Sequence, residues 1–109
     1  MLQLAAYFQE REGFECIVRD EGFATFRFNG EEAYIRDIWV HRDWRKKGIA
    51  SEMADDIARL AIAKGCKYLT GSVSTSANGA HESLLVLLAY GFRLHSAVPG
   101  GIFLRKDLG

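Results

Sequence analysis

The alternation of apolar and polar residues in the first part of the chain predicts three short strands. Residues 23–28 alternate as a half-buried strand does, and residues 14–19 and 33–40 are apolar-rich runs of strand length. The turns between these runs are short and polar, and the pair Asn29-Gly30 is a strong hairpin signal because both residue types tolerate a positive φ. Strands joined by such turns must be antiparallel neighbours. The pattern therefore predicts a three-stranded meander.

Helical spacing replaces this alternation in two places. Residues 2–12 carry a short amphipathic pattern that stops at Gly13. From residue 49 onward, apolar side chains recur at intervals of four, four and three positions, with polar side chains opposite, until Gly65 suits a left-handed helix end. The run that follows, residues 68–73, is a predicted strand. A helix between two strands is a crossover, so residues 33–40 and 68–73 should run parallel.

The rest of the chain predicts a second helix and a terminal hairpin. Residues 74–79 form a loop, residues 80–90 form a more apolar helix, and residues 92–95 and 102–106 are strands around a turn that contains Pro-Gly-Gly. The resulting order is antiparallel meander, crossover helix, parallel strand, helix and hairpin. The predicted fold class is α+β with a mixed sheet, in one domain over residues 1–109.

Composition excludes several classes of function. The chain has 14 basic and 14 acidic residues and no net formal charge, which argues against tight non-specific binding to nucleic acid. No apolar run is long enough for a membrane span, and the first residues lack the regions of a signal peptide. Cys16 and Cys66 lack metal-ligand spacing. We therefore expect no metal site, and two reduced, buried thiols in a cytoplasmic protein.

Candidate chemistry concentrates between residues 40 and 50, where the third strand leads into the crossover helix. This loop holds the cations Arg42, Arg45, Lys46 and Lys47, followed by Gly48. Cations oppose the dipole at a helix N-terminus by roughly 0.3–1 kcal/mol each, which a bound anion would offset. Free N–H groups at a helix start bind phosphate, and a glycine permits close approach. The loop therefore predicts a site for a phosphate-bearing cofactor, with a solvated cationic turn as the alternative.

Residues 45–50 read Arg-Lys-Lys-Gly-Ile-Ala, which resembles the Arg/Gln-x-x-Gly-x-Gly/Ala motif of the GNAT superfamily of N-acetyltransferases. The apolar strand before the motif and the pair Gly91-Phe92 after it are also similar to that family. The resemblance extends from about Phe14 to the end of the chain. It implies a GNAT-like acyl-CoA N-acyltransferase fold with acetyl-CoA as cofactor. The region before the first strand is shorter than the family usually has there.

The resemblance places the cofactor contacts on the strand end, the loop and the first helical turn. The strand ending at Val40 should splay from residues 68–73 and pair with the pantetheine amides, and the Val40 N–H should polarise the thioester carbonyl. Basic side chains and N–H groups of the loop should hold the pyrophosphate. Asn78 resembles a residue that contacts the cofactor arm, or caps the next helix. The predicted cofactor-binding residues are Ile38, Val40, Arg45, Lys46, Lys47, Gly48, Ile49, Ala50, Ser51 and Asn78.

The residues for acid and base chemistry are less evident. Relatives often place a base where this chain has Tyr34 or Arg36, and their acidic Tyr corresponds to Leu87. Asp37 becomes a candidate base if the strand carries a bulge, and is otherwise a solvent-facing charge paired with an Arg. His81 is the second catalytic candidate because imidazole titrates near neutral pH, with a surface position in the first helical turn as the alternative.

Two functions that use the cofactor follow, beside a third in which the loop binds another anion, such as nucleic acid, which the neutral total charge disfavours. The first is an N-acetyltransferase that moves the acetyl group of acetyl-CoA directly to a primary amine of a small molecule or peptide. The second is a catalytically silent acyl-CoA-binding sensor or interaction module, which Leu87 and the missing base favour. The short N-terminal region leaves the acceptor cleft open or completed by another subunit, so a homodimer is one alternative. We interpret Tyr90 as a packed core residue.

Overall fold

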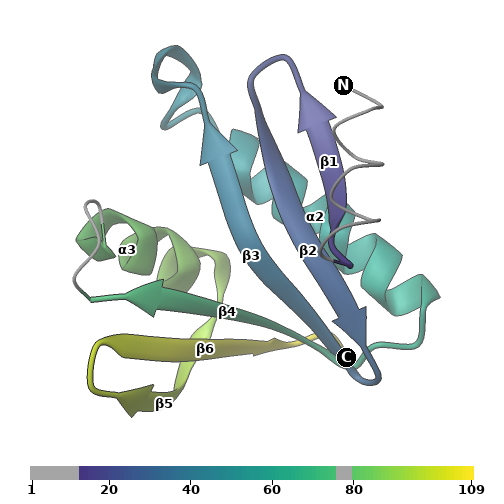
Figure 1. The fold of residues 1–109 in the computed structure, drawn as a ribbon. Helices are drawn as coiled ribbons and strands as arrows, with labels where there is room; N and C mark the ends of the chain where they lie inside the picture. The colour runs from purple at the N-terminus through teal and green to yellow at the C-terminus, as the bar shows by residue number, and fades with distance from the viewer. Residues whose placement is uncertain (1–12, 76–79) are drawn as a thin grey trace.

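The computed structural model describes residues 13–75 and 80–109, and its first three strands form the predicted meander (Figure 1). β1 spans Glu15–Arg19, β2 spans Gly22–Asn29 and β3 spans Glu32–Val40, with antiparallel pairing between neighbours. The helix predicted over residues 2–12 lies outside the described residues.

The hairpin between β2 and β3 turns one residue later than predicted. Asn29 still belongs to β2 and pairs with Glu32, so the two turn residues are Gly30 and Glu31. Gly30 has a φ of +64°, which glycine adopts without the steric penalty of a side chain. The hairpin itself is confirmed, and the later turn sets the register of every pair along β2 and β3.

α2 (Ile49–Ala63) makes the predicted crossover from β3 to β4 (Tyr68–Ser74), and β4 runs parallel to β3. The buried side of α2 packs on β2, β3 and β4. Gly65 has a φ of +85° just beyond the helix, as its position predicted. The helix buries one stripe of side chains at the predicted spacing, namely Met53, Ala54, Ile57 and Ala61.

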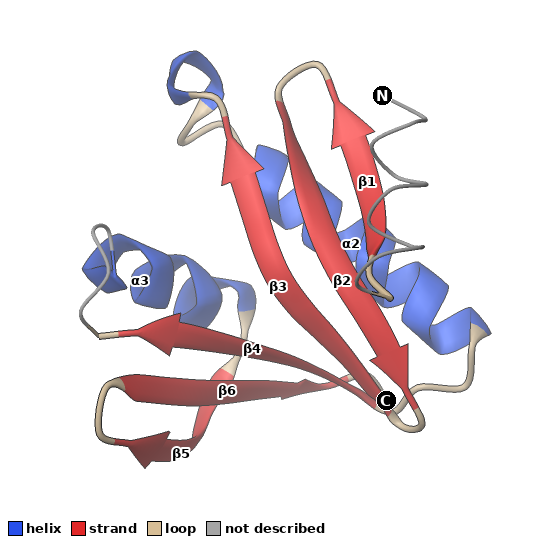
Figure 2. Ribbon diagram, in the orientation of Figure 1, coloured by secondary structure: helices blue, strands red, loops and turns tan. Residues whose placement is uncertain are grey.

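α3 (Ala80–Tyr90) is followed by a hairpin of β5 (Arg93–Val98) and β6 (Gly101–Asp107). β6 pairs with β4, so the strand order is β1-β2-β3-β4-β6-β5 and β5 lies at an edge of the sheet. Figure 2 shows α2 and α3 on the same face of this sheet. The predicted α+β class with a mixed sheet, and the order of its elements, are confirmed for the described residues.

The core fills the space between the sheet and the two helices. Met53 and Ile57 of α2 and Leu69 of β4 are each 0% exposed. Over the described side chains of residues 84–90, α3 is apolar nearly all round but buries one side only. Leu84, Leu87 and Tyr90 pack against the core, whereas Leu85, Val86 and Leu88 remain about half exposed.

Candidate functional site

β3 and β4 form a fork in the middle of the sheet. Their parallel pairing ends at Ile35 and Gly71, although β3 continues to Val40 and β4 to Ser74. Figure 1 shows the two strands diverging beyond that point. Residues 36–40 of β3 therefore have no partner on β4. A ligand that carries amide groups can pair with such a free strand edge as another strand would.

β3 carries a bulge at the fork. Thr25 of β2 pairs with Asp37, whereas the next residue of β2 pairs with Ile35, so Arg36 is the extra residue. The bulge shifts the alternation of side chains along β3 by one position. As a result, Ile38 lies on the same side as Ile35, toward the helices. Asp37 and Thr25 lie on the opposite side of the sheet, because directly paired residues point the same way.

The helix side of the fork is a shallow groove between α2 and α3. The space between its walls is about 270 Å³ when the open solvent above the groove is included. The floor comes from β3 and from Phe92, and the two walls come from the first turns of α2 and the last turns of α3. The surface is mostly apolar, with the Ser51 and Tyr90 hydroxyls as its side-chain polar groups. The lining residues are Ile35, Ile38, Ala50, Ser51, Ala54, Val86, Leu87, Tyr90 and Phe92.

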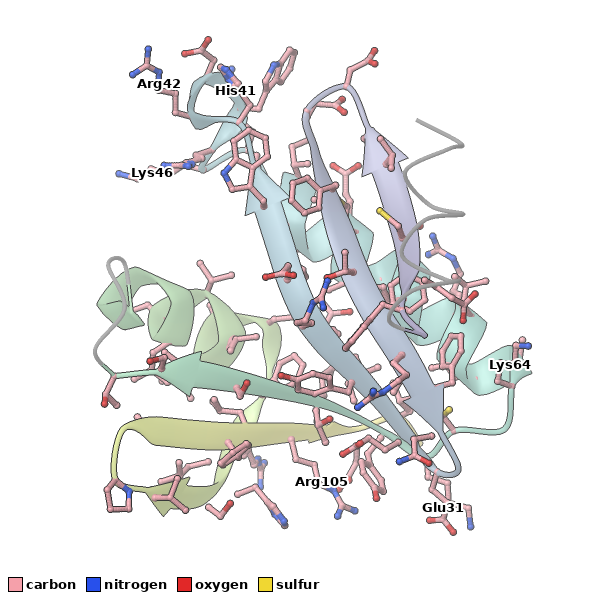
Figure 3. The ribbon with its side chains drawn as sticks, in the orientation of Figure 1. Glu31, His41, Arg42, Lys46, Lys64 and Arg105 are labelled. Carbon is pink, nitrogen blue, oxygen red and sulfur yellow. The ribbon has the colours of Figure 1, made fainter. Side chains whose placement is uncertain are left out.

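The basic loop begins where β3 ends and contains a short 3-10 turn, η1 (Arg42–Trp44). Hydrogen bonds hold its backbone in place. The His41 N–H donates to the Glu21 carbonyl at 2.7 Å, and Arg45 Nε donates to the Val40 carbonyl at 2.9 Å. Arg45 thus ties the loop to the strand end, while its guanidinium keeps further N–H groups for an anion. Figure 3 shows Arg42 and Lys46 pointing away from the sheet at this tip of the molecule.

α2 begins with unused backbone donors. Gly48 is its N-cap, with a φ of +83° and no side-chain cap. The first internal bond is the one that the Glu52 N–H donates to the Gly48 carbonyl at 3.0 Å. Within residues 13–75 and 80–109, no acceptor is found for the N–H groups of residues 49–51. A Cβ added to Gly48 would have nothing within 4 Å. The open helix start and the nearby cations fit a pyrophosphate.

Asp37 is half exposed and is held by two donors. Thr25 Oγ1 donates to Asp37 Oδ2 at 2.7 Å, and Arg36 Nε donates to the same oxygen at 3.0 Å. The sequence left two alternatives for Asp37, a surface charge paired with an Arg or a candidate base on a bulged strand. The structure contains both the pairing with Arg36 and the bulge. Because Thr25 is 0% exposed, it fixes the position of the carboxylate on the side of the fork opposite the groove.

Two predicted site residues cannot be placed at the level of side chains. Asn78 lies outside the described residues. His81 contributes its backbone to the first turn of α3, but its side chain lies outside the described part. The other predicted residues lie on the unpaired end of β3, in the basic loop and in the first turn of α2. Asp37 faces the side of the sheet opposite the groove.

Leu87 and Tyr90 line the groove from α3. Leu87 carries no proton to donate. Tyr90, which the sequence favours as core, is half buried, and its hydroxyl donates to Asp55 Oδ1 of α2 at 2.6 Å. Burial and this carboxylate raise the pKa of Tyr90. The signal in the sequence is the four-residue spacing of Val86 and Tyr90, which places both on one side of α3.

Three hydroxyls on the other side of the fork escaped prediction. Tyr34 Oη and Ser72 Oγ lie 2.9 Å apart and join β3 to β4 just where the strands separate. Thr70 pairs with Tyr34 across the parallel strands, and its buried Oγ1 has no hydrogen-bond partner in the described part of the chain. Nothing in the sequence reveals this grouping, because it depends on the register between two strands on either side of the crossover.

Comparison with known proteins identifies relatives in sequence. The model of the acetyltransferase (GNAT) family matches residues 2–84 of the chain. A curated relative, thialysine N-epsilon-acetyltransferase of Bos taurus, is 32% identical over 59 residues. That match covers 50% of this chain and 33% of the relative, so the chain spans about a third of that protein's length.

Solved structures share the fold over nearly the whole chain. A GNAT family acetyltransferase from Elizabethkingia anophelis, with acetyl-CoA bound, has a TM-score of 0.71 at 20% identity. The match covers 99% of this chain and 84% of that one. The PaiA N-acetyltransferase from Thermoplasma acidophilum, in complex with coenzyme A, has a TM-score of 0.76 at 12% identity, covering 97% of this chain and 69% of that one. At these identities the likeness establishes the fold.

Proposed function

We propose that this chain, which belongs to the acetyltransferase (GNAT) family, transfers the acetyl group of acetyl-CoA to a primary amine. The observation that carries this proposal is the conjunction of three features at one place: the fork of β3 and β4, the cationic loop, and the open start of α2. Solved proteins of the same fold bind acetyl-CoA and coenzyme A. Residues 1–109 would act as one GNAT-like domain.

The residues present fit the cofactor in charge and in shape. The N–H groups of residues 49–51, with Gly48 leaving space before them, would hold the pyrophosphate together with the cations of the loop. The Ser51 hydroxyl, which lines the groove, is a further donor. The backbone of Ile38 and Val40 would pair with the pantetheine amides in the fork. Asn78 is proposed as an additional contact to the cofactor arm.

Acetyl-CoA, when bound, would supply a thioester whose carbonyl carbon takes the amine nitrogen while the C–S bond breaks and the thiolate leaves, to be protonated by solvent. The Val40 N–H would donate to the carbonyl oxygen, and a donor in such a place contributes roughly 100- to 1,000-fold in rate. Asp37 would take the proton that the amine loses, directly or through a water. His81 is the second candidate for this role. Thr25 would keep the Asp37 carboxylate fixed on the acceptor side of the fork.

Release of free thiol from acetyl-CoA, measured with a panel of small amines and lysine peptides, tests the proposed reaction. We expect release that depends on an amine and stops when the amine is omitted. Asp37→Asn should lower kcat at least tenfold with little change in the KM for acetyl-CoA. Asp107→Asn is the matched control, because Asp107 is also an exposed carboxylate that accepts from an Arg Nε at 3.0 Å. Equal rates in the two variants would exclude Asp37 as the base.

A second candidate function keeps the cofactor and omits the reaction. Leu87 in the groove carries no acidic proton, and the Tyr90 hydroxyl is committed to Asp55. These observations favour an acyl-CoA-binding sensor or interaction module. The same assay separates the two functions, since a silent binder takes up acetyl-CoA and releases no thiol with any amine.

We propose that the acceptor is a small molecule or a peptide that carries an amine. A homodimer would gain from β5, an edge strand on which Leu94 is 64% exposed. Sedimentation over a range of concentrations, with Leu94→Lys for comparison, tests this pairing.

Two free cysteines suit the reducing cytoplasm. In the described part of the chain, no helix is long and apolar enough to cross a membrane.

A further inference from the structure

The Tyr90 hydroxyl joins the two helices that form the walls of the groove. Tyr90 is the last residue of α3, and its Oη donates to Oδ1 of Asp55, which lies in the second turn of α2, at 2.6 Å. Within the described part of the chain, this is the one side-chain hydrogen bond between α2 and α3. A bond that short to a carboxylate is among the stronger hydrogen bonds that a neutral donor forms.

The surroundings of Tyr90 hold its ring in the orientation that this bond needs. The ring centroid lies 6.0 Å from that of Phe92, with an angle of 37° between the planes. Phe92 is buried in the core. On another side, Lys106 Nζ lies 5.6 Å from the ring centroid. Tyrosine ionises near pH 10, and burial and Asp55 raise the pKa of Tyr90 further, so its hydroxyl stays a donor in neutral and mildly alkaline solution.

The Tyr90–Asp55 bond lies along the groove, toward the end of the fork where β3 and β4 still pair. The α2 wall ends at Ala54, next to Asp55, and the α3 wall ends at Tyr90 itself. Ile35, the last residue of β3 that pairs with β4, lines the same groove. The basic loop lies beyond the opposite end of the α2 wall, before Ala50. The Tyr90–Asp55 bond is thus placed to set how far apart the walls stand where the strands begin to separate.

We propose that Tyr90 and Asp55 form a positioning pair that holds α2 and α3 at the separation needed to bind the pantetheine arm of an acyl-CoA. This inference rests on the proposed function. A groove whose walls are already fixed loses less conformational freedom when a flexible chain enters it, so affinity rises without a new contact to the ligand. Tyr90 acts here through Asp55 and does not serve as the acid that protonates the departing thiol.

Four variants test the pair: Tyr90→Phe, Asp55→Ala, Asp55→Asn and the double variant Tyr90→Phe/Asp55→Ala. The readouts are the Kd for acetyl-CoA by calorimetry and the midpoint of thermal unfolding. Tyr90→Phe and Asp55→Ala should each weaken binding by about three- to tenfold, the range of one hydrogen bond. The double variant should bind acetyl-CoA no more weakly than either single variant, because each single variant already removes the same bond. Asp55→Asn keeps an oxygen acceptor and should restore most of the affinity.

The control is Tyr68→Phe, which removes a hydroxyl from a half-buried Tyr of β4 whose ring packs under Arg105, away from the groove. It should bind acetyl-CoA as the wild type does. Unchanged Kd in Tyr90→Phe with a lower unfolding midpoint would overturn the inference, since the bond would then serve stability alone. A large loss of kcat with unchanged Kd would also overturn it and indicate an acid. If the wild type itself does not bind acetyl-CoA, the proposed function fails first.

Discussion

Lys46, in the basic loop, adopts a backbone conformation that residues with a side chain disfavour. Among the described residues it is the one non-glycine residue with a positive φ, at +61°. The left-handed conformation costs an L-residue about 1–2 kcal/mol. Glycine avoids this cost, but its greater conformational freedom in the unfolded chain lowers the free energy of unfolding by about 0.5–1 kcal/mol. Lys46→Gly should therefore raise the free energy of unfolding by about 0.5 kcal/mol.

Urea unfolding measures this change, and Lys47→Gly is the matched control. It removes the same charge from the next position, where φ is not positive, and it also loses the Lys47 ammonium that lies 5.3 Å from the Trp44 ring centroid. We expect Lys47→Gly to destabilise the protein. An equal destabilisation by Lys46→Gly would show that the left-handed backbone carries no strain.

Stability should fall in alkaline solution. Burial raises the pKa of Cys66, and burial together with the bond to Asp55 raises the pKa of Tyr90. A group whose pKa is raised by folding contributes its full stability below its unfolded pKa and loses that contribution as pH rises toward the folded pKa. Unfolded Cys and Tyr ionise near pH 8.5 and pH 10. The free energy of unfolding should therefore decline above about pH 9.

Tyr90→Phe isolates one part of this decline. Urea unfolding from about pH 7 to pH 11 should show a smaller loss above pH 10 in Tyr90→Phe than in the wild type, because the variant lacks the phenol at position 90, the one whose pKa folding raises. Superimposable pH profiles of the two proteins would contradict the account of Tyr90.

Residue types were enough to locate the basic loop, since four cations and a glycine before a helix have few other physical reasons to occur together. They were not enough to reveal its internal contacts. The Arg45 bond to the Val40 carbonyl depends on the path of η1, and the Tyr90 bond to Asp55 joins positions 35 residues apart. Such contacts depend on how separate elements pack, which periodicity does not report.

At the scale of elements, α2 supports the site through its buried stripe. Ile57 is 0% exposed beneath the sheet, and Ile62 of the same helix is 57% exposed. Ile57→Ala should lower the free energy of unfolding by about 2–4 kcal/mol, because it leaves a cavity in the core. Ile62→Ala should change it by less than about 0.5 kcal/mol. Chemical denaturation compares the two, and similar losses would mean that α2 is not anchored as described.

The elements were predictable because each carries its own signal. Period-two and helical patterns, with Asn29-Gly30, Gly65 and Gly91 between them, define most of the strands and helices. The bulge left a trace as well, since apolar residues at 33 and 35 are followed by apolar residues at 38 and 40. The order of β6 and β5 left no such trace, because either strand of a terminal hairpin can pair with β4. The exposed side of α3 was also not foreseen from its apolar composition.

At the scale of the whole molecule, the fork gives access to β3 from two sides. The groove between α2 and α3 lies on one side, and Asp37 lies on the other. Positive charge gathers at one tip, although the chain as a whole has no net charge. This division suits a reaction in which an anionic cofactor enters from the helix side and an amine approaches from the opposite side. We propose that this tip and the groove together bind acetyl-CoA.

Calorimetric titration of Gly48→Glu with acetyl-CoA tests that claim most directly. Gly65→Glu is the matched control, because both glycines have φ near +85° and open space around the added Cβ, but Gly65 lies at the other end of α2. The two variants should unfold at similar temperatures. The wild type and Gly65→Glu should bind acetyl-CoA with micromolar Kd, and Gly48→Glu should not bind, since its carboxylate occupies and repels the pyrophosphate site. Undiminished affinity in Gly48→Glu would contradict the assignment of the cofactor site to the start of α2.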